Sequence, residues 1–175
     1  MRKSYIWIIL GFIIVISLGL YQLNKQGALN PVDAQGTTIV KRAVDGDTLL
    51  LASGQRVRLI GIDTPETHDS PKLYRDSKRN KMSVRLIKAM GEKAYSFTRD
   101  LVEGKRVRLE FDVQKRDQYN RLLAYVYLED GTFVNEKIIR EGYAYLLTIP
   151  PDVKYASLFK EAFDEARVNH RGLWK

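Results

Sequence analysis

The 175-residue sequence contains no cysteine and only two histidines, His68 and His170. The absence of cysteine excludes disulfide bonds, thiolate metal sites, thiol catalysis and a lipid anchor on a cysteine side chain. With two histidines, an imidazole metal cluster or a histidine general base has little to build on. Any hydrolytic chemistry in this chain therefore has to depend on carboxylates and arginines.

Acidic residues are fewer than basic ones, and the formal net charge is +8. Residues 1–25 hold three basic side chains and no acid, so residues 26–175 carry 26 basic and 21 acidic side chains, a net charge of +5. The apolar fraction of 45% and the ten tyrosines indicate one globular domain rather than a disordered chain. A basic body suits a polyanionic partner, although a modest positive charge is also common in proteins that bind no nucleic acid.

The longest apolar run, residues 6–21, contains no charge and follows Arg2 and Lys3. It is longer than the usual signal-peptide core of about 7 to 15 residues and shorter than a membrane span of about 20. We therefore predict that residues 1–25 form a signal peptide or an uncleaved signal anchor and that residues 26–36 form a polar linker. Because the basic residues precede the run, the rest of the chain is expected outside the cytoplasm, secreted or held at the membrane by this segment.

Residues 37–175 are predicted to form a single α+β domain. Alternating or β-rich segments bounded by turn residues predict five short strands, at residues 37–44, 47–51, 56–62, 105–111 and 122–128. Apolar periodicity predicts three helices, at residues 91–102, 134–141 and 155–169. This order favours a five-stranded β-barrel resembling the oligonucleotide-binding (OB) fold. Residues 68–90 are charged and irregular, and we interpret them as a solvated loop with one helical turn near residues 84–89, in preference to a DNA clamp.

The predicted strand at residues 56–62 leads into a turn with three polar residues, Asp63, Thr64 and Glu66. Arg58 lies five residues before Asp63, and Pro65 restrains the turn before any ligand binds. Carboxylates gathered in one loop repel each other unless water, basic side chains or a hard cation offsets their charge. Taken alone the turn fits a solvated loop equally well. If the sheet curls into a barrel, Asp47 at the start of the second strand comes close to it.

Three motifs carry a resemblance to a known family. They are Asp-Gly-Asp-Thr at residues 45–48, Arg-Leu-Ile-Gly-Ile-Asp-Thr-Pro-Glu-Thr at residues 58–67, and Tyr-Asn-Arg-Leu-Leu-Ala-Tyr at residues 119–125. In this order and spacing the chain resembles the thermonuclease family, also called staphylococcal or micrococcal nuclease, over nearly all of residues 37–174. The resemblance implies an OB-type barrel of five strands with three helices. It also implies a calcium-dependent endonuclease that cleaves DNA and RNA phosphodiesters to 3′-phosphate products.

The resemblance also implies a role for each charged position of these motifs. Asp47 and Asp63 would be calcium ligands with the Thr64 carbonyl, Glu66 would hold the attacking water, Arg58 and Arg121 would bind the scissile phosphate, and Tyr119 would contact a nucleotide. The chemistry suits these residue types, since calcium takes six to eight oxygen ligands in flexible geometry and arginine presents a fork to phosphate oxygens. The remaining polar residues, Asp45, His68, Asp112 and Asp117, are interpreted as turn, solvated or structural groups.

The chain departs from the family pattern beside the expected nucleotide pocket. The family tyrosine that packs against the nucleotide falls at Thr148, and the next aromatic falls at Pro150. Tyr145 and Tyr155 are the candidate replacements, and the preference between DNA and RNA and the endo/exo balance stay open. Two alternatives are a noncatalytic nucleic-acid-binding barrel and a hydrolase of another phosphodiester, such as a lipid headgroup. No obligate protein partner is inferred, and a monomer is expected.

Overall fold

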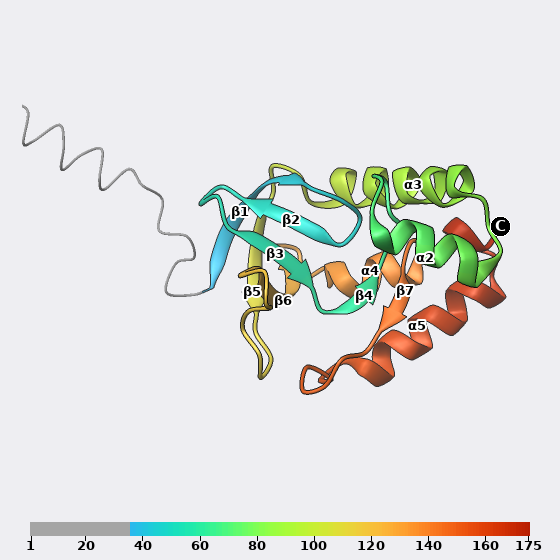
Figure 1. Ribbon diagram of the computed structural model, residues 1–175. Coiled ribbons are helices and arrows are strands. Elements are labelled where there is room, and N and C mark those ends of the chain that lie inside the picture. The colour runs from blue at the N-terminus through green and yellow to red at the C-terminus, as the bar shows by residue number, and fades with distance from the viewer. Residues whose placement is uncertain (1–35) are drawn as a thin grey trace, which may run out of the picture. The chain divides into compact units, whose positions relative to one another are not determined.

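The computed structural model describes residues 36–175, in which five strands close into a barrel and two more form a separate ribbon (Figure 1). In order around the barrel the strands are β1 (Thr37–Ala43), β2 (Thr48–Leu51), β3 (Arg56–Leu59), β6 (Leu122–Leu128) and β5 (Arg106–Glu110). β3 and β6 run parallel, and the other neighbours run antiparallel. The ribbon pairs β4 (Gly61–Asp63) with β7 (Tyr145–Leu147). The predicted five-stranded barrel is confirmed.

Alternation of apolar and charged residues places the barrel core. In β5, Val107 and Leu109 are buried, whereas Arg106 and Arg108 point to solvent. This pattern is typical of a strand with one face on the core and one in water. Tyr125 in β6 is the largest fully buried side chain among the described residues, and its hydroxyl donates to an Asp112 carboxylate oxygen at 2.9 Å. The buried tyrosine thus ties the barrel core to the loop after β5.

The prediction of one continuous strand over residues 56–62 is wrong, because the chain turns sharply between β3 and β4. Gly61 has a φ of +84°, which a residue with a side chain rarely adopts, and a Cβ there would lie 2.4 Å from the Phe159 ring. The buried Asn135 side chain holds the break from the other side. Its Nδ2 donates to the Ile60 carbonyl at 2.9 Å, and its Oδ1 accepts from the Val126 N–H at 3.0 Å. The turn carries Asp63 off the barrel and into the ribbon with β7.

The described residues form four α-helices and one short 3₁₀ helix. They are α2 (Pro71–Asn80), α3 (Val84–Val102), α4 (Val134–Arg140), α5 (Ala156–Val168) and η1 (Gly172–Trp174). They gather at one end of the barrel, with α4 packed between α3 and α5 (Figure 1). Within residues 36–175 no helix is both long and apolar enough to cross a membrane. The predicted signal segment at residues 1–25 and nearly all of the 26–36 linker lie outside the described residues.

The prediction of an irregular loop over residues 68–90 is also wrong, since most of this segment is helical. Ser70 caps α2 by accepting from the Leu73 N–H at 3.1 Å, and Pro71 occupies the first helical turn. Lys81, in the left-handed conformation, ends α2, and Ser83 caps α3 in the same way that Ser70 caps α2. Residues 68–90, which contain α2 and the first turns of α3 directly after the turn at residues 63–66, are called the helical insertion below. The three-residue strand β7 was likewise not predicted.

Candidate active site

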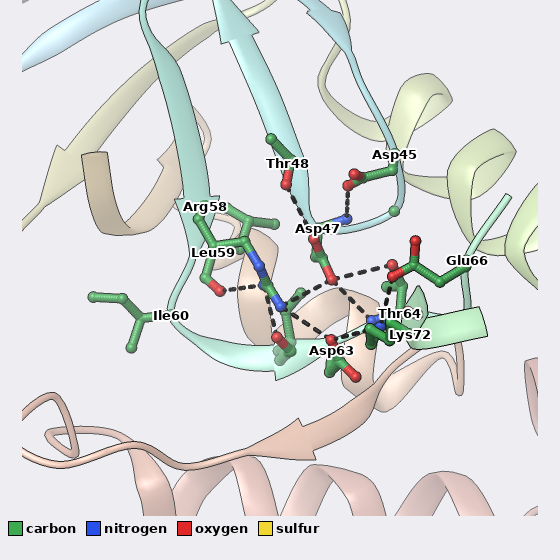
Figure 2. Close-up of polar contacts among 12 residues, drawn as sticks. Asp45, Asp47, Thr48, Arg58, Leu59, Ile60, Asp63, Thr64, Glu66 and Lys72 are labelled. Carbon is green, nitrogen blue, oxygen red and sulfur yellow. Dashed lines mark hydrogen bonds and ion pairs between the residues drawn. The ribbon is translucent and has the colours of Figure 1, made fainter. Parts of the chain in front are cut away.

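Asp47 and the turn after β4 are joined by direct hydrogen bonds (Figure 2). One Asp47 carboxylate oxygen accepts from the Thr64 N–H at 2.9 Å and from the Thr64 hydroxyl at 3.2 Å. The two turns can approach this closely because Gly46 has no side chain, since a Cβ there would lie 2.7 Å from the Thr64 methyl carbon. The curl of the sheet therefore brings Asp47 close to the turn that follows β4, as predicted.

Arg58 is the centre of the polar contacts in Figure 2. Its Nη1 donates to the carbonyls of Leu59 and Ile62 at 2.9 and 2.7 Å. Its Nη2 lies 3.1 Å from an Asp47 oxygen and 3.2 Å from an Asp63 oxygen. These contacts involve both terminal nitrogens of the guanidinium. A phosphate that approaches these nitrogens would therefore compete with the two carboxylates and the two carbonyls.

Burial and neighbouring charges shift the pKa values of three acids at the site in different directions. Burial raises the pKa of Asp47, but the Arg58 guanidinium and the Thr64 N–H outweigh it, so this pKa lies below its ordinary value. Burial raises the pKa of Asp63 despite nearby Lys72 and Arg58. Burial, and then the charge of Asp47, raise the pKa of Asp45 to about 7. A further cation beside these groups would favour their ionised forms.

The ammonium of Lys72, from the first turn of α2, lies among three oxygens of the turn. Its Nζ is 3.1 Å from an Asp63 oxygen, 2.9 Å from a Glu66 oxygen and 3.2 Å from the Thr64 carbonyl. These three groups belong to the set that the family resemblance implies for calcium and the attacking water. Because carboxylate and carbonyl oxygens that already converge on one cation are the donors calcium prefers, the donor set fits this metal. Among residues 36–175 no three acidic or histidine side chains are grouped closely enough to hold a metal ion by themselves.

Arg121 and Tyr119 lie at a cavity of about 280 Å³, which Arg58 also lines and which we call the Arg121 cavity. The Nε of Arg121 donates to an Asp117 carboxylate oxygen at 2.7 Å, and the guanidinium carbon lies 5.4 Å from the centre of the Tyr119 ring. Neither terminal nitrogen of Arg121 forms a hydrogen bond or ion pair with a described residue. The structure thus brings both predicted phosphate-binding arginines to one cavity and leaves the fork of Arg121 open.

The two candidate tyrosines have different surroundings. The Tyr155 hydroxyl donates to a Glu110 oxygen at 2.9 Å, and its ring packs against Tyr125, Phe133 and Phe159, so it belongs to the core. Tyr145 lies in β7 directly opposite Asp63 in the strand register. Tyr145 is therefore the replacement that the structure places beside the site.

Sequence reasoning missed Lys72, and no motif marked it. The pair Ser70–Pro71 is a helix-start signal that would have placed Lys72 in a first helical turn, but not its contact with Asp63. His68, interpreted as a solvated loop residue, is exposed, and its Nδ1 lies 2.6 Å from the Thr67 hydroxyl oxygen. Thr148 and Pro150, where the family pattern has aromatics, are both exposed.

Comparison with known proteins gives consistent matches. The family model described as "Staphylococcal nuclease homologue" matches residues 56–175. A thermonuclease of Staphylococcus intermedius is 34% identical over 183 residues, covering 100% of this chain and 99% of the relative. A thermonuclease of Staphylococcus hyicus is 32% identical over 175 residues, covering 95% and 94%. Endonuclease YncB of Bacillus subtilis (strain 168) is 35% identical over 163 residues, covering 88% and 71%.

Proposed function

Because the chain belongs to the staphylococcal nuclease family and is an endonuclease, we propose that it hydrolyses DNA and RNA with calcium and leaves 3′-phosphate products. The observation that carries the proposal is the convergence of Asp63, Glu66 and the Thr64 carbonyl on one cation, the Lys72 ammonium. An arginine that already bridges Asp47 and Asp63 lines the adjoining cavity for a phosphate. Acids, arginines and a cation-binding point are the groups that phosphodiester hydrolysis needs.

In this proposal Asp47, Asp63 and the Thr64 carbonyl would hold the calcium ion. When bound, calcium polarises the phosphoryl group and offsets the charge that a dianionic transition state adds beside the carboxylates. The hydrogen bonds from the Thr64 N–H and hydroxyl to Asp47 fix one of these carboxylates before any ion arrives. Folding thus places the Asp47 carboxylate near Asp63 before any ion binds, and the electrostatic repulsion between the two acids is offset during folding.

Arg58 and Arg121 would bind the nonbridging oxygens of the scissile phosphate from two sides of the Arg121 cavity. The Nε of Arg121 is held by Asp117, which orients the guanidinium and leaves its two terminal nitrogens available for a phosphate. Tyr119 lies beside Arg121 with 70% of its surface exposed, which suits contact with a neighbouring nucleotide. The open fork of Arg121 and the positive charge of Arg58 beside one phosphate would stabilise the added transition-state charge more than the ground state.

Glu66 would accept the proton of the attacking water. Its two carboxylate oxygens are held by different partners, one by the Lys72 ammonium at 2.9 Å and the other by the Ser70 hydroxyl at 3.3 Å. Both partners lie at the start of α2, so the helix that follows the turn orients the proposed base. A carboxylate within reach of a water beside a cation is suited to general base catalysis.

Calcium removal is expected to abolish cleavage. We expect EGTA to slow degradation of single-stranded DNA, double-stranded DNA and RNA by a factor on the order of a hundred or more, because the added transition-state charge is then uncompensated. Restoring calcium should restore the rate, and end-labelled oligonucleotides should show 3′-phosphate termini. Equal rates in EGTA would contradict the calcium assignment. Salt-sensitive DNA binding without any cleavage would favour a noncatalytic nucleic-acid-binding barrel. Cleavage confined to lipid phosphodiesters would favour a hydrolase of lipid headgroups.

We propose further that the catalytic domain works outside the cytoplasm as a monomer, secreted or attached through residues 1–25. The support is the charge-free run at residues 6–21 behind Arg2 and Lys3. Amino-terminal sequencing of the protein recovered from culture medium and from washed membranes measures this. A mature terminus downstream of residue 21 in the medium indicates cleavage, and an intact terminus in the membrane fraction indicates an anchor. Recovery of the intact chain from the cytosol alone would contradict the proposal.

A further inference from the structure

The positive charge of the domain is concentrated in the helical insertion. Residues 68–90 carry seven of the 26 basic side chains and two of the 20 acidic side chains of residues 36–175. Their net charge is +5, and the other described residues together carry only +1. The domain is therefore nearly neutral except beside the turn that holds Asp63 and Glu66.

Part of this charge forms a row along one face of α2. Lys72, Arg75 and Arg79 are three and four residues apart, a spacing that places them on the same side of a helix. Arg75 and Arg79 are exposed, and Arg75 forms no ion pair with any described residue. Arg79 lies 3.3 Å from Asp76 and Lys72 is paired with acids of the turn, so Arg75 is the member of the row with no acidic partner among the described residues. The row begins at the proposed calcium ligands and extends for about 10 Å along the helix.

This row is one wall of a groove of about 510 Å³, which we call the α2 groove. The other wall is β7, which contributes Tyr145 and Leu147, and Asp63 and Thr64 lie where the groove meets the active site. Figure 1 shows α2 beside this ribbon. The Tyr145 ring is held edge-on against Trp174, with centroids 5.3 Å apart, so it is ordered before a ligand binds. A cationic wall facing an aromatic wall matches the two parts of a nucleotide, its phosphate and its base.

The α2 groove is different from the Arg121 cavity. The Arg121 cavity is lined by Arg58, Gly61 and Ile62, whereas the α2 groove takes its site residues from Asp63 onward, and the two share Leu147. They therefore adjoin successive parts of the ribbon. A polynucleotide with its scissile phosphate at Arg58 has a strand to place on each side of the cut bond, and the two adjoining sites offer a place for each.

We propose that the α2 groove binds the strand on the other side of the scissile phosphate, with Arg75 and Arg79 on its phosphates and Tyr145 stacked on a base. This inference rests on the proposed nuclease function and adds a second subsite to it. The subsite tolerates any sequence, because its contacts are to the backbone and to a ring face. It would give this protein an affinity that rises with the length of the strand.

The test pairs two double variants of equal charge. Arg75→Gln with Arg79→Gln removes the groove cations, whereas Lys78→Gln with Arg85→Gln removes two exposed charges of the same insertion that do not line the groove. With a 20-nucleotide single strand, the groove variant should raise KM about tenfold at little change in kcat, and the control should stay near the wild type. The slope of log affinity against log salt should become shallower by about 1.4 in the groove variant, as expected for two lost contacts on a single strand. A nucleoside p-nitrophenyl phosphate, too short to reach the groove, should be cleaved alike by all three proteins.

Tyr145→Leu tests the aromatic wall. It should weaken binding of oligodeoxythymidylate about tenfold and leave binding of an abasic strand of equal length unchanged. Fluorescence anisotropy in EGTA measures this binding without cleavage, so the subsite is tested even if the proposed chemistry fails. Equal loss of affinity in the groove and control variants would overturn the proposal, because a diffuse field would then explain the binding. An unchanged KM for the long strand in the groove variant would overturn it as well.

Discussion

Arg121→Lys is expected to lower kcat on DNA by about a hundred- to a thousandfold while changing KM little. The substitution keeps the positive charge and allows an ion pair with Asp117, so the field at the site is nearly preserved. It removes the two terminal nitrogens that the structure leaves open toward the Arg121 cavity. A lysine lacks the planar fork whose two nitrogens match two nonbridging oxygens, and that match matters most when charge builds on the phosphate. Steady-state kinetics on a labelled oligonucleotide measures both constants.

Arg106→Lys is the matched control for this change. Arg106 is also paired with a carboxylate, that of Glu129 at 3.3 Å, but it lines neither the Arg121 cavity nor the α2 groove. Thermal melting of both variants should stay close to that of the wild type, since each substitution keeps the positive charge beside its carboxylate. A kcat of Arg121→Lys within threefold of the wild type would show that charge alone suffices there.

Glu66→Gln is expected to lower kcat by about a hundred- to ten-thousandfold, the range typical of a lost general base. The amide keeps the size of the side chain and can still accept from the Ser70 hydroxyl, which lies 3.3 Å from one carboxylate oxygen. It cannot take a proton from water. Cleavage should also lose the part of its pH dependence that the carboxylate provides, so the pH–rate profile distinguishes a base from a residue that only orients Lys72.

Glu161→Gln on the exposed side of α5 removes the same charge without touching the site. It should cleave like the wild type, and both variants should bind single-stranded DNA in EGTA with similar affinity. If Glu66→Gln retains the wild-type rate and pH profile, the base lies elsewhere and Glu66 is not the group that activates the water.

The barrel could be predicted from sequence because its strands carry local signals. Residues 105–111 alternate, and the predicted strand at 122–128 matches β6 residue for residue. The resemblance to the family supplied the site residues, and the structure places Asp47, Arg58, Asp63, Thr64 and Glu66 in one network. The strands could be predicted from short-range periodicity, and the site residues from sequence motifs. Closure of the barrel explains why these motifs, though separated in the sequence, meet at one site.

The insertion could not be predicted in the same way. α2 buries only Leu73, so it has no apolar stripe, and its charges look like those of a solvated loop. β7 has three residues and exists through its pairing with β4, a partner more than eighty residues earlier. The break at Gly61 depends on Phe159, and the choice of Tyr145 over Tyr155 depends on core packing. All of these are long-range contacts, which local propensity does not report.

The position of Lys72 changes how an ion enters this protein. Its ammonium lies within 3.2 Å of three oxygens, so the chain supplies its own counter-ion to the acid pocket. If the proposed calcium site is correct, an arriving metal would exchange with this tethered cation. A monovalent ion gains little charge by this exchange and has to overcome the high local concentration of the tethered amine. A divalent ion would add a full unit of positive charge, so the proposed exchange would favour divalent over monovalent ions.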